Sequence, residues 1–440
     1  MTKGIQIVSI RSVVAVLALL ASNAQAINNN VEVTGPQLEE GENAARIIPY
    51  GFYNADTGLA AAAVFIGKGY IQDQVISVGN VWAGQNGSYQ LFWANSDVLL
   101  PFSDRLFIDS AFMYSNWDEV DTYQSGNPDF PDERAGSNDS DVDNFITASG
   151  DDLFGYVTLR YLLPVGDGRG DPIHDFYLEK GLLVPGAEAG GRGWNPLQSG
   201  RTTLELRPFY RDQNFEQDSS GDSFENSTAG IKLSLEYDNT DWYNNPTRGT
   251  RQRLTLSRDW GFLEDSSSWT SVQFRHSQFF DLGATAKARQ RVLALDVWTS
   301  DVPTWNSFHI NSDGERVFHR APLFEGSTLG GLERQRAYPG HRFHDRAAIN
   351  YTAEYRYIPK WNALSEVPLI SSLGIPWWQW VGFLEVGRVA DKWSLGELHR
   401  DMKVSLGGGV RALVYGLVIR VDAGVSEEGG AVQMFFRQPF

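Results

Sequence analysis

The sequence contains no cysteine among its 440 residues. This absence excludes a disulfide scaffold, a thiol nucleophile and any metal site with cysteine ligands. Basic residues are also scarce, because 37 Lys and Arg stand against 54 Asp and Glu and leave a formal net charge of −17. Proteins that bind nucleic acid need clustered Lys and Arg at the phosphates, so the charge balance argues against a nucleic-acid partner.

Long hydrophobic runs are missing as well. The apolar stretch Val13–Ala21 has nine residues, whereas a helix needs about 20 to cross a bilayer. It follows Lys3 and Arg11 and precedes Ala24–Ala26 (AQA), which is the pattern of a secretory signal peptide with its cleavage site. We therefore predict a signal peptide over residues 1–26 and, because no later run reaches 18 apolar residues, no transmembrane helix.

Short segments with alternating apolar and polar residues are what the chain has instead. In 417–425 (LVIRVDAGV), apolar residues occupy every second position, with Arg420 and Asp422 between them. This alternation is typical of strands in a membrane barrel, with lipid on one face and a polar lumen on the other. Turn residues separate the segments. The predicted strands begin near residues 46, 58, 74, 88, 105, 152, 201, 228, 250, 269, 289, 347, 378, 403, 417 and 431.

The fold class predicted from this pattern is all-β, a transmembrane antiparallel β-barrel of sixteen strands. An even strand number places both termini in the periplasm, and long loops then belong on the outer side. Two long connections on the periplasmic side do not follow this rule, 166–200 and 359–377. The first is either a periplasmic insertion or the site of a hidden hairpin that raises the count to eighteen. The predicted outer loops are 117–151, 216–227, 299–346 and 391–401.

The two ends of the mature chain carry separate predictions. Residues 27–45 form a short periplasmic tail, and residues 46–440 form the barrel. The last strand, 431–440, ends with aromatic residues at Phe436 and Phe440. A terminal aromatic that closes an alternating strand resembles the sorting signal of bacterial outer-membrane barrels. Pro439 departs from that pattern, because it removes one donor from the ladder.

A loop motif points to a family. Residues 329–345 (LGGLERQRAYPGHRFHD) resemble the lumen-loop motif of the BamA/TamA-like outer-membrane proteins, the bacterial surface antigen superfamily. Gln335 and Ala337 depart from the family pattern. Residues 383–387 resemble the family's FxDxG strand, with Glu385 in place of Asp, and the likeness extends over about 228–440. The matching residues are Leu329, Gly330, Gly331, Arg336, Tyr338, Arg342, Phe343 and Asp345 in the loop, and Phe383, Glu385 and Gly387 in the strand.

The resemblance implies several expectations about the site and the setting. It implies a loop folded into the lumen, with Arg336 as the donor and Glu385 as the acceptor on a strand; the alternative is a solvated outer loop. In a wet lumen this ion pair would contribute little to the free energy of folding and would mainly position the loop. The implied location is the outer membrane of a Gram-negative bacterium. The implied partners are outer-membrane lipid and lipopolysaccharide, the barrel-assembly machinery during biogenesis, and client proteins or lipids of unknown identity.

Family members that fold or secrete proteins usually carry periplasmic POTRA modules before the barrel. Here only residues 27–45 separate the predicted cleavage site from the first strand. A module of that kind does not fit in this length. We therefore expect a POTRA-less barrel.

Two further groups of residues are candidates for metal or catalytic sites. The acidic segment 117–151 contains Asp139-x-Asp141-x-Asp143, but Asn144 and Gly150 stand where a calcium loop needs Gly and Glu. A solvated loop is the favoured interpretation, with loose binding of divalent ions as the alternative. Four histidines, at positions 309, 319, 341 and 344, raise the possibility of a metal or hydrolase site, yet no GxSxG motif accompanies them. We expect no catalytic residue, no metal and no cofactor.

Three functions remain open. The first is an accessory barrel that inserts or transports proteins or lipids, working at the seam between strands 46–54 and 431–440, where Pro49 and Pro439 would weaken pairing. The second is a passive diffusion pore, since sixteen strands enclose enough space for a channel. The third, least favoured, is an outer-membrane enzyme. A tryptophan cluster at 377, 378 and 380 is interpreted as part of the membrane-interface girdle.

Overall fold

The computed structural model describes residues 29–34, 44–54, 57–124, 126–218, 223–263, 266–366, 371, 374–414 and 416–440. The predicted signal peptide, 1–26, lies outside the described residues. No helix in the described part of the chain is long and apolar enough to cross a membrane.

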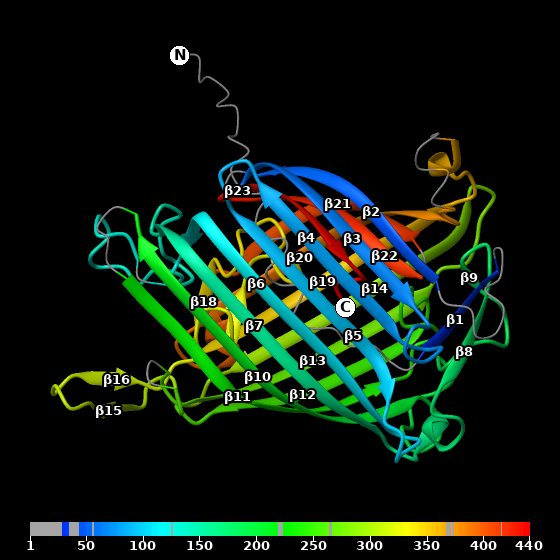
Figure 1. Ribbon diagram of the computed structural model, residues 1–440, viewed down its shortest axis with the longest axis horizontal. Helices are drawn as coiled ribbons and strands as arrows, with labels where there is room; N and C mark the ends of the chain where they lie inside the picture. Colours follow the sequence, from blue (N-terminus) through cyan, green and yellow to red (C-terminus); the bar gives the residue numbers. More distant parts are fainter. Residues whose placement is uncertain are drawn as a thin grey trace.

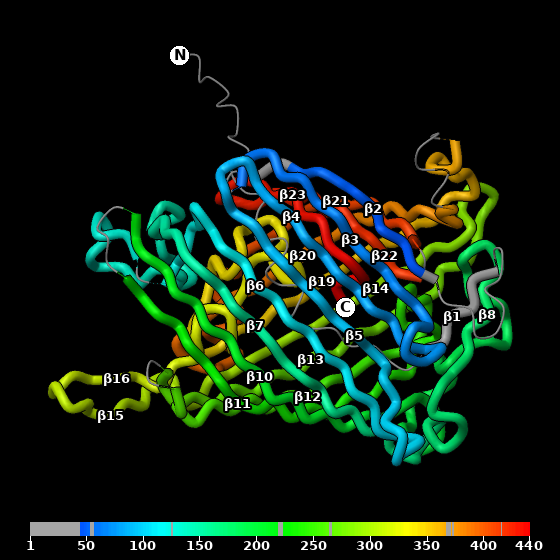
Figure 2. The backbone as a smooth tube through the Cα atoms, in the orientation of Figure 1, coloured from blue at the N-terminus to red at the C-terminus, as the bar shows by residue number. Residues whose placement is uncertain are grey.

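One antiparallel sheet of sixteen strands makes up the body of the protein, and its strands follow one another in sequence order. Figures 1 and 2 show the tilted strands curling into a barrel. The predicted all-β fold and strand number are confirmed. The strands are β2 (Ala44–Asn54), β3 (Gly58–Lys68), β4 (Ile76–Gly84), β5 (Tyr89–Leu99), β6 (Leu106–Thr122), β7 (Ile146–Leu162), β10 (Arg201–Gln217), β11 (Ser223–Asp238), β12 (Gly249–Asp259), β13 (Trp269–Asp281), β14 (Ala288–Asp301), β19 (Ala347–Pro359), β20 (Trp378–Ala390), β21 (Lys403–Val414), β22 (Leu417–Ser426) and β23 (Gly429–Phe436).

The two faces of the sheet differ as a membrane barrel requires. On β22, Val421 and Val425 are exposed, while Arg420 and Asp422 are each 2% exposed. The same alternation recurs around the barrel, so that leucines such as Leu204, Leu233 and Leu254 lie on the outer face. Because lipid tails do not solvate charge, the charged side chains turn inward and pair there.

A small second sheet occupies the connection between β7 and β10. It consists of β1 (Asn29–Thr34), β8 (His174–Glu179) and β9 (Leu182–Leu183), preceded by the 3₁₀ turn η2 (Gly166–Arg169). The 166–200 segment therefore does contain a hairpin. That hairpin stays outside the barrel sheet, so the strand count remains sixteen.

The longest connection, between β14 and β19, holds two short hairpins. The first, β15 (Phe308–Ile310) with β16 (Arg316–Phe318), projects away from the barrel (Figure 1). The second, β17 (Ser327–Leu329) with β18 (Phe343–Asp345), forms the base of the predicted lumen loop. The other short elements are η3 (Ala363–Glu366) and α2 (Leu395–Leu398).

The predicted outer loop 117–151 is too long by more than ten residues. β6 continues to Thr122 and β7 already begins at Ile146. Some of the acidic residues that suggested a loop therefore lie in strands. Asp121, near the end of β6, accepts from the Thr147 hydroxyl at 2.8 Å, and Asp151, in β7, accepts from the Tyr114 hydroxyl at 2.6 Å.

The girdle interpretation is wrong for Trp377, which is buried in an apolar cluster with Phe176 and Trp242. Trp378 and Trp380 both have the outward parity of β20, and their ring centroids lie 4.8 Å apart. Trp380 is 50% exposed, whereas Trp378 is covered and donates to the Trp361 carbonyl at 2.9 Å.

The first and last strands of the sheet meet without a ladder. β2 and β23 stand at the two ends of the strand order, and no pairing joins them within the described residues. Their contact is apolar. Phe436 packs with Val64 and Ile66, and Ile48 and Ile419 pack against this group.

The faces that meet at this seam show how the edges are arranged. Phe436 has the same parity as the exposed Val432, so it lies on the outer face of β23. Tyr50, which packs in the same cluster as Ile48, accepts a hydrogen bond from the buried Asn80 and so lies on the inner face of β2. The C-terminal edge of the sheet therefore tucks inside the N-terminal edge.

Candidate functional site

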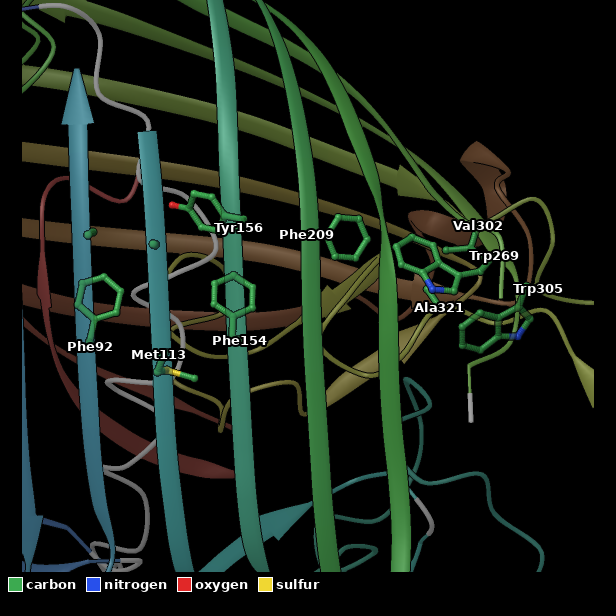
Figure 3. Packing of buried hydrophobic residues seen from close by; sticks show 11 residues of the cluster. Phe92, Met113, Phe154, Tyr156, Phe209, Trp269, Val302, Trp305 and Ala321 are labelled. Carbon is green, nitrogen blue, oxygen red and sulfur yellow. The ribbon is translucent and has the colours of Figure 1, made fainter. Parts of the chain in front are cut away.

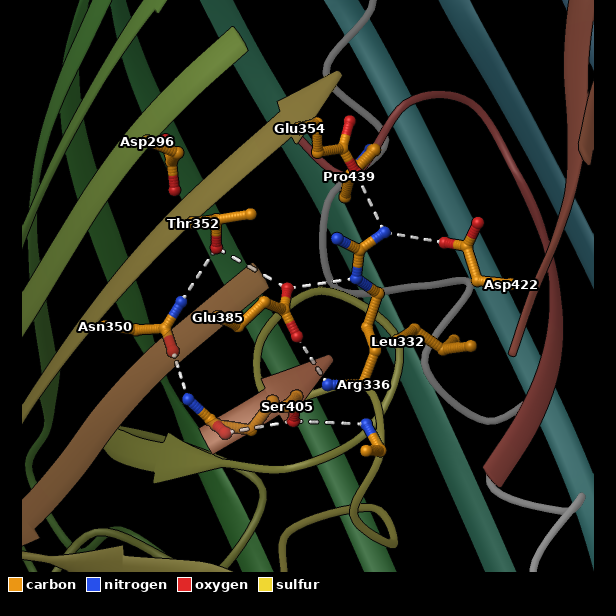
Figure 4. Close-up of polar contacts among 12 residues, drawn as sticks. Asp296, Leu332, Arg336, Asn350, Thr352, Glu354, Glu385, Ser405, Asp422 and Pro439 are labelled. Carbon is orange, nitrogen blue, oxygen red and sulfur yellow. Dashed lines mark hydrogen bonds and ion pairs between the residues drawn. The ribbon is translucent and has the colours of Figure 1, made fainter. Parts of the chain in front are cut away.

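The loop between β14 and β19 is held in the lumen by a buried arginine. The Arg336 side chain is 1% exposed, and its Nε donates to Glu385 at 2.9 Å. Its Nη1 lies 2.7 Å from Asp422 and 2.8 Å from Glu354. These carboxylates come from β20, β22 and β19, so one guanidinium joins three strands to the loop (Figure 4). The structure thus brings Arg336 and Glu385 together, in a setting much drier than the wet lumen that was expected.

Three more arginines surround these carboxylates. Glu354 accepts from Arg411 at 2.7 Å and from Arg356 at 2.8 Å, and Asp422 accepts from Arg420. Glu385, by contrast, has Arg336 as its one ion-pair partner among the described residues. The Arg336 guanidinium also lies 3.7 Å from the centre of the Phe383 ring. The loop tip is therefore seated by a compact network of four arginines and three carboxylates.

The network includes residues that the sequence interpretation missed. Glu354 and Asp422 were not proposed as partners, nor were Arg356, Arg411 and Arg420. A signal was present, because each of these residues stands at an inward position of an alternating strand. The alternation along each strand shows which residues face the lumen. It does not show which of the many charged residues there pair with Arg336.

The two departures from the family motif have local explanations. Gln335 is fully buried, donates to Asn350 at 3.0 Å and accepts from Ser405 at 3.0 Å. A Cβ on Gly387 would lie 2.9 Å from the Gln335 amide nitrogen, so glycine at 387 makes room for it. Ala337 lies against Gly424, where an added Cβ would approach it to 3.2 Å. A missing side chain on β22 thus accommodates the alanine that stands for glycine.

Arg342 and Asp345 connect the lumen loop to the loop above it. Arg342 donates to Glu428 at 2.7 Å and to the Ser140 carbonyl at 2.7 Å. Asp345 pairs with Arg134 at 2.6 Å. The acidic loop 126–145 is therefore not simply solvated, because its backbone and Arg134 bind residues of the lumen loop.

The aromatic motif residues pack within the loop itself. Tyr338 and Phe343 lie edge to face with ring centroids 5.1 Å apart, and both are fully buried. They pack with Trp298, Leu329 and neighbouring strand residues in one cluster.

The opposite wall of the lumen holds the same connection by apolar contacts. Val302, Trp305 and Ala321, from the start of the connection, pack onto a row of inward aromatic and apolar side chains (Figure 3). This row comes from five strands and comprises Phe92, Met113, Phe154, Tyr156, Phe209 and Trp269. The connection therefore spans the lumen, anchored by apolar packing on one wall and by ion pairs on the other.

Gly330 has a backbone requirement that can be tested. Its φ is +105°, and an added Cβ would lie 2.2 Å from the Pro339 carbonyl oxygen. Gly314, at the projecting hairpin, has φ +84° but nothing within 4 Å. We expect Gly314→Ala to cost about 1–3 kcal/mol from backbone strain alone, and Gly330→Ala to cost clearly more and to expose the loop. The rate of proteolysis within 326–346 measures this exposure, and equal rates in the two variants would contradict the close approach.

The C-terminal residues lie inside the barrel. The predicted strand 431–440 ends at Phe436, and the chain then turns at Arg437, whose φ is +70°. Pro439 accepts a hydrogen bond from Arg275 at 3.0 Å, and Phe440 stacks on Phe279 with centroids 6.2 Å apart. Phe440 is therefore seated on the lumen wall rather than at the end of a strand. Its role as a sorting signal, with Phe436, stays a prediction.

The tail is also joined to the lumen loop. Arg437 donates to Glu333 at 3.0 Å, and Gln433 donates to the Arg336 carbonyl at 3.0 Å. The seam strand β23, the tail and the loop consequently form one connected unit in the lumen.

The histidines do not assemble into a catalytic or metal site. His309 lies beside His319, and His344 lies against Trp305. No group of three or more His, Asp or Glu side chains suited to a metal occurs among the described residues. Burial lowers the pKa of both His341 and His344 to about 3, with further lowering by nearby arginines. Neutral imidazoles with this pKa are poor general acids near neutral pH.

These lowered values predict an acid response of the loop. Between pH 6.5 and 3 the unfolded chain binds protons at His341 and His344 that the folded chain does not, so stability falls as pH falls below 6.5. We expect the free energy of unfolding to be smaller at pH 5 than at pH 7, and His344→Gln to reduce that difference. Denaturant unfolding at both pH values measures it. A difference unchanged in His344→Gln would show that this histidine does not contribute.

An antiparallel barrel with an apolar outer face and a lumen loop anchored by a buried arginine defines a class of outer-membrane-type barrel. Residues 195–370, which span β10 to β19 and the loop motif, match the Omp85 superfamily domain. This match covers less than half of the chain, and it agrees with the resemblance of the loop motif to BamA/TamA-like barrels.

Comparisons with solved structures give more distant similarities. The crystal structure of BamA from Haemophilus ducreyi lacking POTRA domains 1–3 is 11% identical, with a TM-score of 0.46, over 91% of this chain and 70% of that chain. CdiB from Acinetobacter baumannii is 10% identical, with a TM-score of 0.47, over 90% of this chain and 59% of that chain. No curated protein matches the sequence.

Proposed function

We propose that this protein is an outer-membrane barrel of a Gram-negative bacterium that inserts or moves proteins or lipids, and that its working part is the seam between β2 and β23. The observation that carries the proposal is the seam itself, where two strand edges meet through apolar side chains and no ladder joins them in the described chain. Barrels of the Omp85 superfamily act in protein insertion or secretion, which supports this choice.

The physical argument starts from the unpaired edges. A strand edge with free N–H and C=O groups is a template for another strand, and strand addition is a common way to bind an extended polypeptide. Pro49 lies within β2 and cannot donate to a ladder. Pro439 lies beyond the end of β23, so the prediction that it weakens the seam is wrong.

The tail and the loop support a controlled opening of the seam. An outward movement of β23 would break the stacking of Phe440 on Phe279 and the hydrogen bond from Arg437 to Glu333. A client that pairs with the β2 edge would therefore compete with these contacts.

A passive pore is the alternative function, and the arrangement of the lumen favours it less. The connection between β14 and β19 spans the lumen, and a cavity of about 120 Å³ lies beside the loop. A pore of this kind would show steady open conductance, whereas a plugged barrel would not. The enzyme alternative has no support from the histidine positions described above.

The chain's lack of cysteine makes the seam directly testable. We expect Ile48→Cys with Phe436→Cys, joined by a short bismaleimide, to bring the folding rate of a urea-unfolded outer-membrane protein in proteoliposomes down to that of protein-free liposomes. The transfer rate of a fluorescent phospholipid is measured in parallel. The matched control joins Ala423→Cys to Val432→Cys, which already face each other across the β22–β23 ladder. Undiminished rates in the joined seam variant would refute the seam as the working part.

A further inference from the structure

The small sheet beside the barrel contains a pairing between distant parts of the chain. β1 pairs with β8 in parallel, from Asn29 opposite His174 to Thr34 opposite Glu179. β8 is the central strand, with β9 on its other edge. β1 is thus an edge strand that covers one side of β8, and residues 35–43 connect it to the barrel strand β2.

β8 rests on a firm base. Phe176 and Leu178 are 1% and 0% exposed and pack with Trp242 and Trp377. The loop after β8 is fixed as well, because Arg289 donates to the Lys180 carbonyl at 2.9 Å. The strand is therefore fixed to the barrel by its own buried side chains and by its turn.

The backbone groups that β8 offers to β1 can be assigned. Val184 donates to the Tyr177 carbonyl at 2.9 Å, so Tyr177 directs its backbone groups toward β9. Alternate residues of a strand direct theirs to opposite sides. His174, Phe176 and Leu178 consequently direct their backbone groups toward β1. Without β1, these donors and acceptors form an open edge on a preformed platform.

β1 has one strand neighbour in the described part of the chain. Within the described residues, β8 is the strand that pairs with it, and parallel pairing is slightly less stable per residue than antiparallel pairing. In the sequence, nine residues separate β1 from β2, and a covalent connection of that length corresponds to an effective concentration in the millimolar range. A parallel edge strand that is covalently joined to the barrel is suited to exchange with another strand on the buried β8.

We propose that the edge of β8 is a binding site for an extended polypeptide segment, which adds in parallel in place of β1. The tethered β1 strand is the resident occupant and competes with that segment. Recognition rests on main-chain hydrogen bonds and is therefore tolerant of sequence. This inference rests on the proposed function in one respect, since the natural segment would belong to a client polypeptide; the binding site itself is tested without any client.

The probe is a capped fluorescent peptide with the sequence of residues 29–34, NNVEVT, added to the full refolded chain. We expect weak binding to the unaltered chain, because tethered β1 occupies the edge. Substituting Val31→Pro and Glu32→Pro in β1 removes donors of both parities, and we expect the peptide to bind this variant at least tenfold more tightly, as measured by fluorescence anisotropy. A peptide N-methylated at alternate residues is the matched control and is expected not to bind.

Hydrogen exchange of the segment 174–179 gives a second readout that does not depend on the peptide. We expect the amides of Phe176 and Leu178 to exchange faster in the proline variant and to regain protection when the peptide is added. Equal exchange in the variant and the unaltered chain would overturn the assignment of β1 as the occupant. Faster exchange without peptide binding would overturn the site. Either failure leaves the seam experiment unaffected, because that experiment measures folding and lipid transfer.

Discussion

Replacing Arg336 with alanine is expected to lower the free energy of unfolding by about 3–5 kcal/mol, the usual cost of breaking a buried ion pair from one side. The loss falls mainly on Glu385, which retains no other cation among its described ion pairs. Glu354 keeps Arg411 and Arg356, and Asp422 keeps Arg420. The loop tip should therefore leave its seat on β20 while the rest of the network remains.

The release of the loop should be visible as conductance. We expect the unaltered barrel to be closed or to flicker in planar bilayers, and Arg336→Ala to show large, longer-lived openings. Arg336→Lys should behave like the alanine variant to a substantial degree, since one ammonium cannot reproduce the fork that meets three carboxylates. Steady, large channels in the unaltered barrel would favour the passive pore and count against the proposed function.

A matched control separates this effect from a general loss of charge. Arg346 pairs with Asp301 at 3.2 Å, and both side chains are more than one quarter exposed. Exposed pairs contribute about 0–1 kcal/mol, so Arg346→Ala should leave both stability and conductance nearly unchanged. An Arg336→Ala variant that matched this control would show that the buried network does not seat the loop.

Replacing Phe440 with alanine is expected to produce the second large effect, a loss of about 3–5 kcal/mol, as for other buried aromatic side chains. Phe440 is 5% exposed, stacks on Phe279 and lies beneath the guanidinium of Arg356. Its removal should also loosen β23, because the tail is what continues that strand into the lumen. Faster hydrogen exchange in 429–436 would report this loosening.

The same substitution distinguishes a structural role from a sorting role. The stability of barrel refolded in detergent depends on the lumen seat but not on the cellular assembly machinery. We expect Phe440→Ala to lose stability there, whereas Val432→Ala, on the outer face of β23, should change little. If refolded Phe440→Ala were as stable as the unaltered barrel and only its assembly in cells fell, the terminal aromatic would serve sorting alone.

The strand pattern was predictable because it follows from local chemistry. A strand between lipid and a polar lumen alternates with period two, and this alternation places the sixteen strands to within a few residues at most boundaries. The errors occurred where the period is hidden by charge. Asp151 was assigned to a loop, yet it lies in β7 and accepts from the Tyr114 hydroxyl on β6.

The candidate site was predictable only in part. The likeness of 329–345 and 383–387 to a family pattern suggested that Arg336 would meet Glu385, and the structure places them 2.9 Å apart. The pairing of Arg336 with Asp422, of Arg342 with the 126–145 loop and of Arg437 with Glu333 could not be read from spacing. The first of these pairs is 86 residues apart in the sequence, and Arg342 is 202 residues from Ser140. Which of the many inward charges meet is decided by how the barrel closes.

The sequence by itself determined that this chain alternates as a membrane barrel, with sixteen strands or, counting a possible hairpin in 166–200, eighteen, and that one loop carries an arginine motif. Only the tertiary structure decided that the C-terminal edge tucks inside the N-terminal edge, that Phe440 turns into the lumen, and that β1 covers β8. The physical reason is that alternation records the environment on each side of a strand. It does not record how the two ends of a curved sheet meet, because that depends on the packing of side chains brought together by the whole barrel.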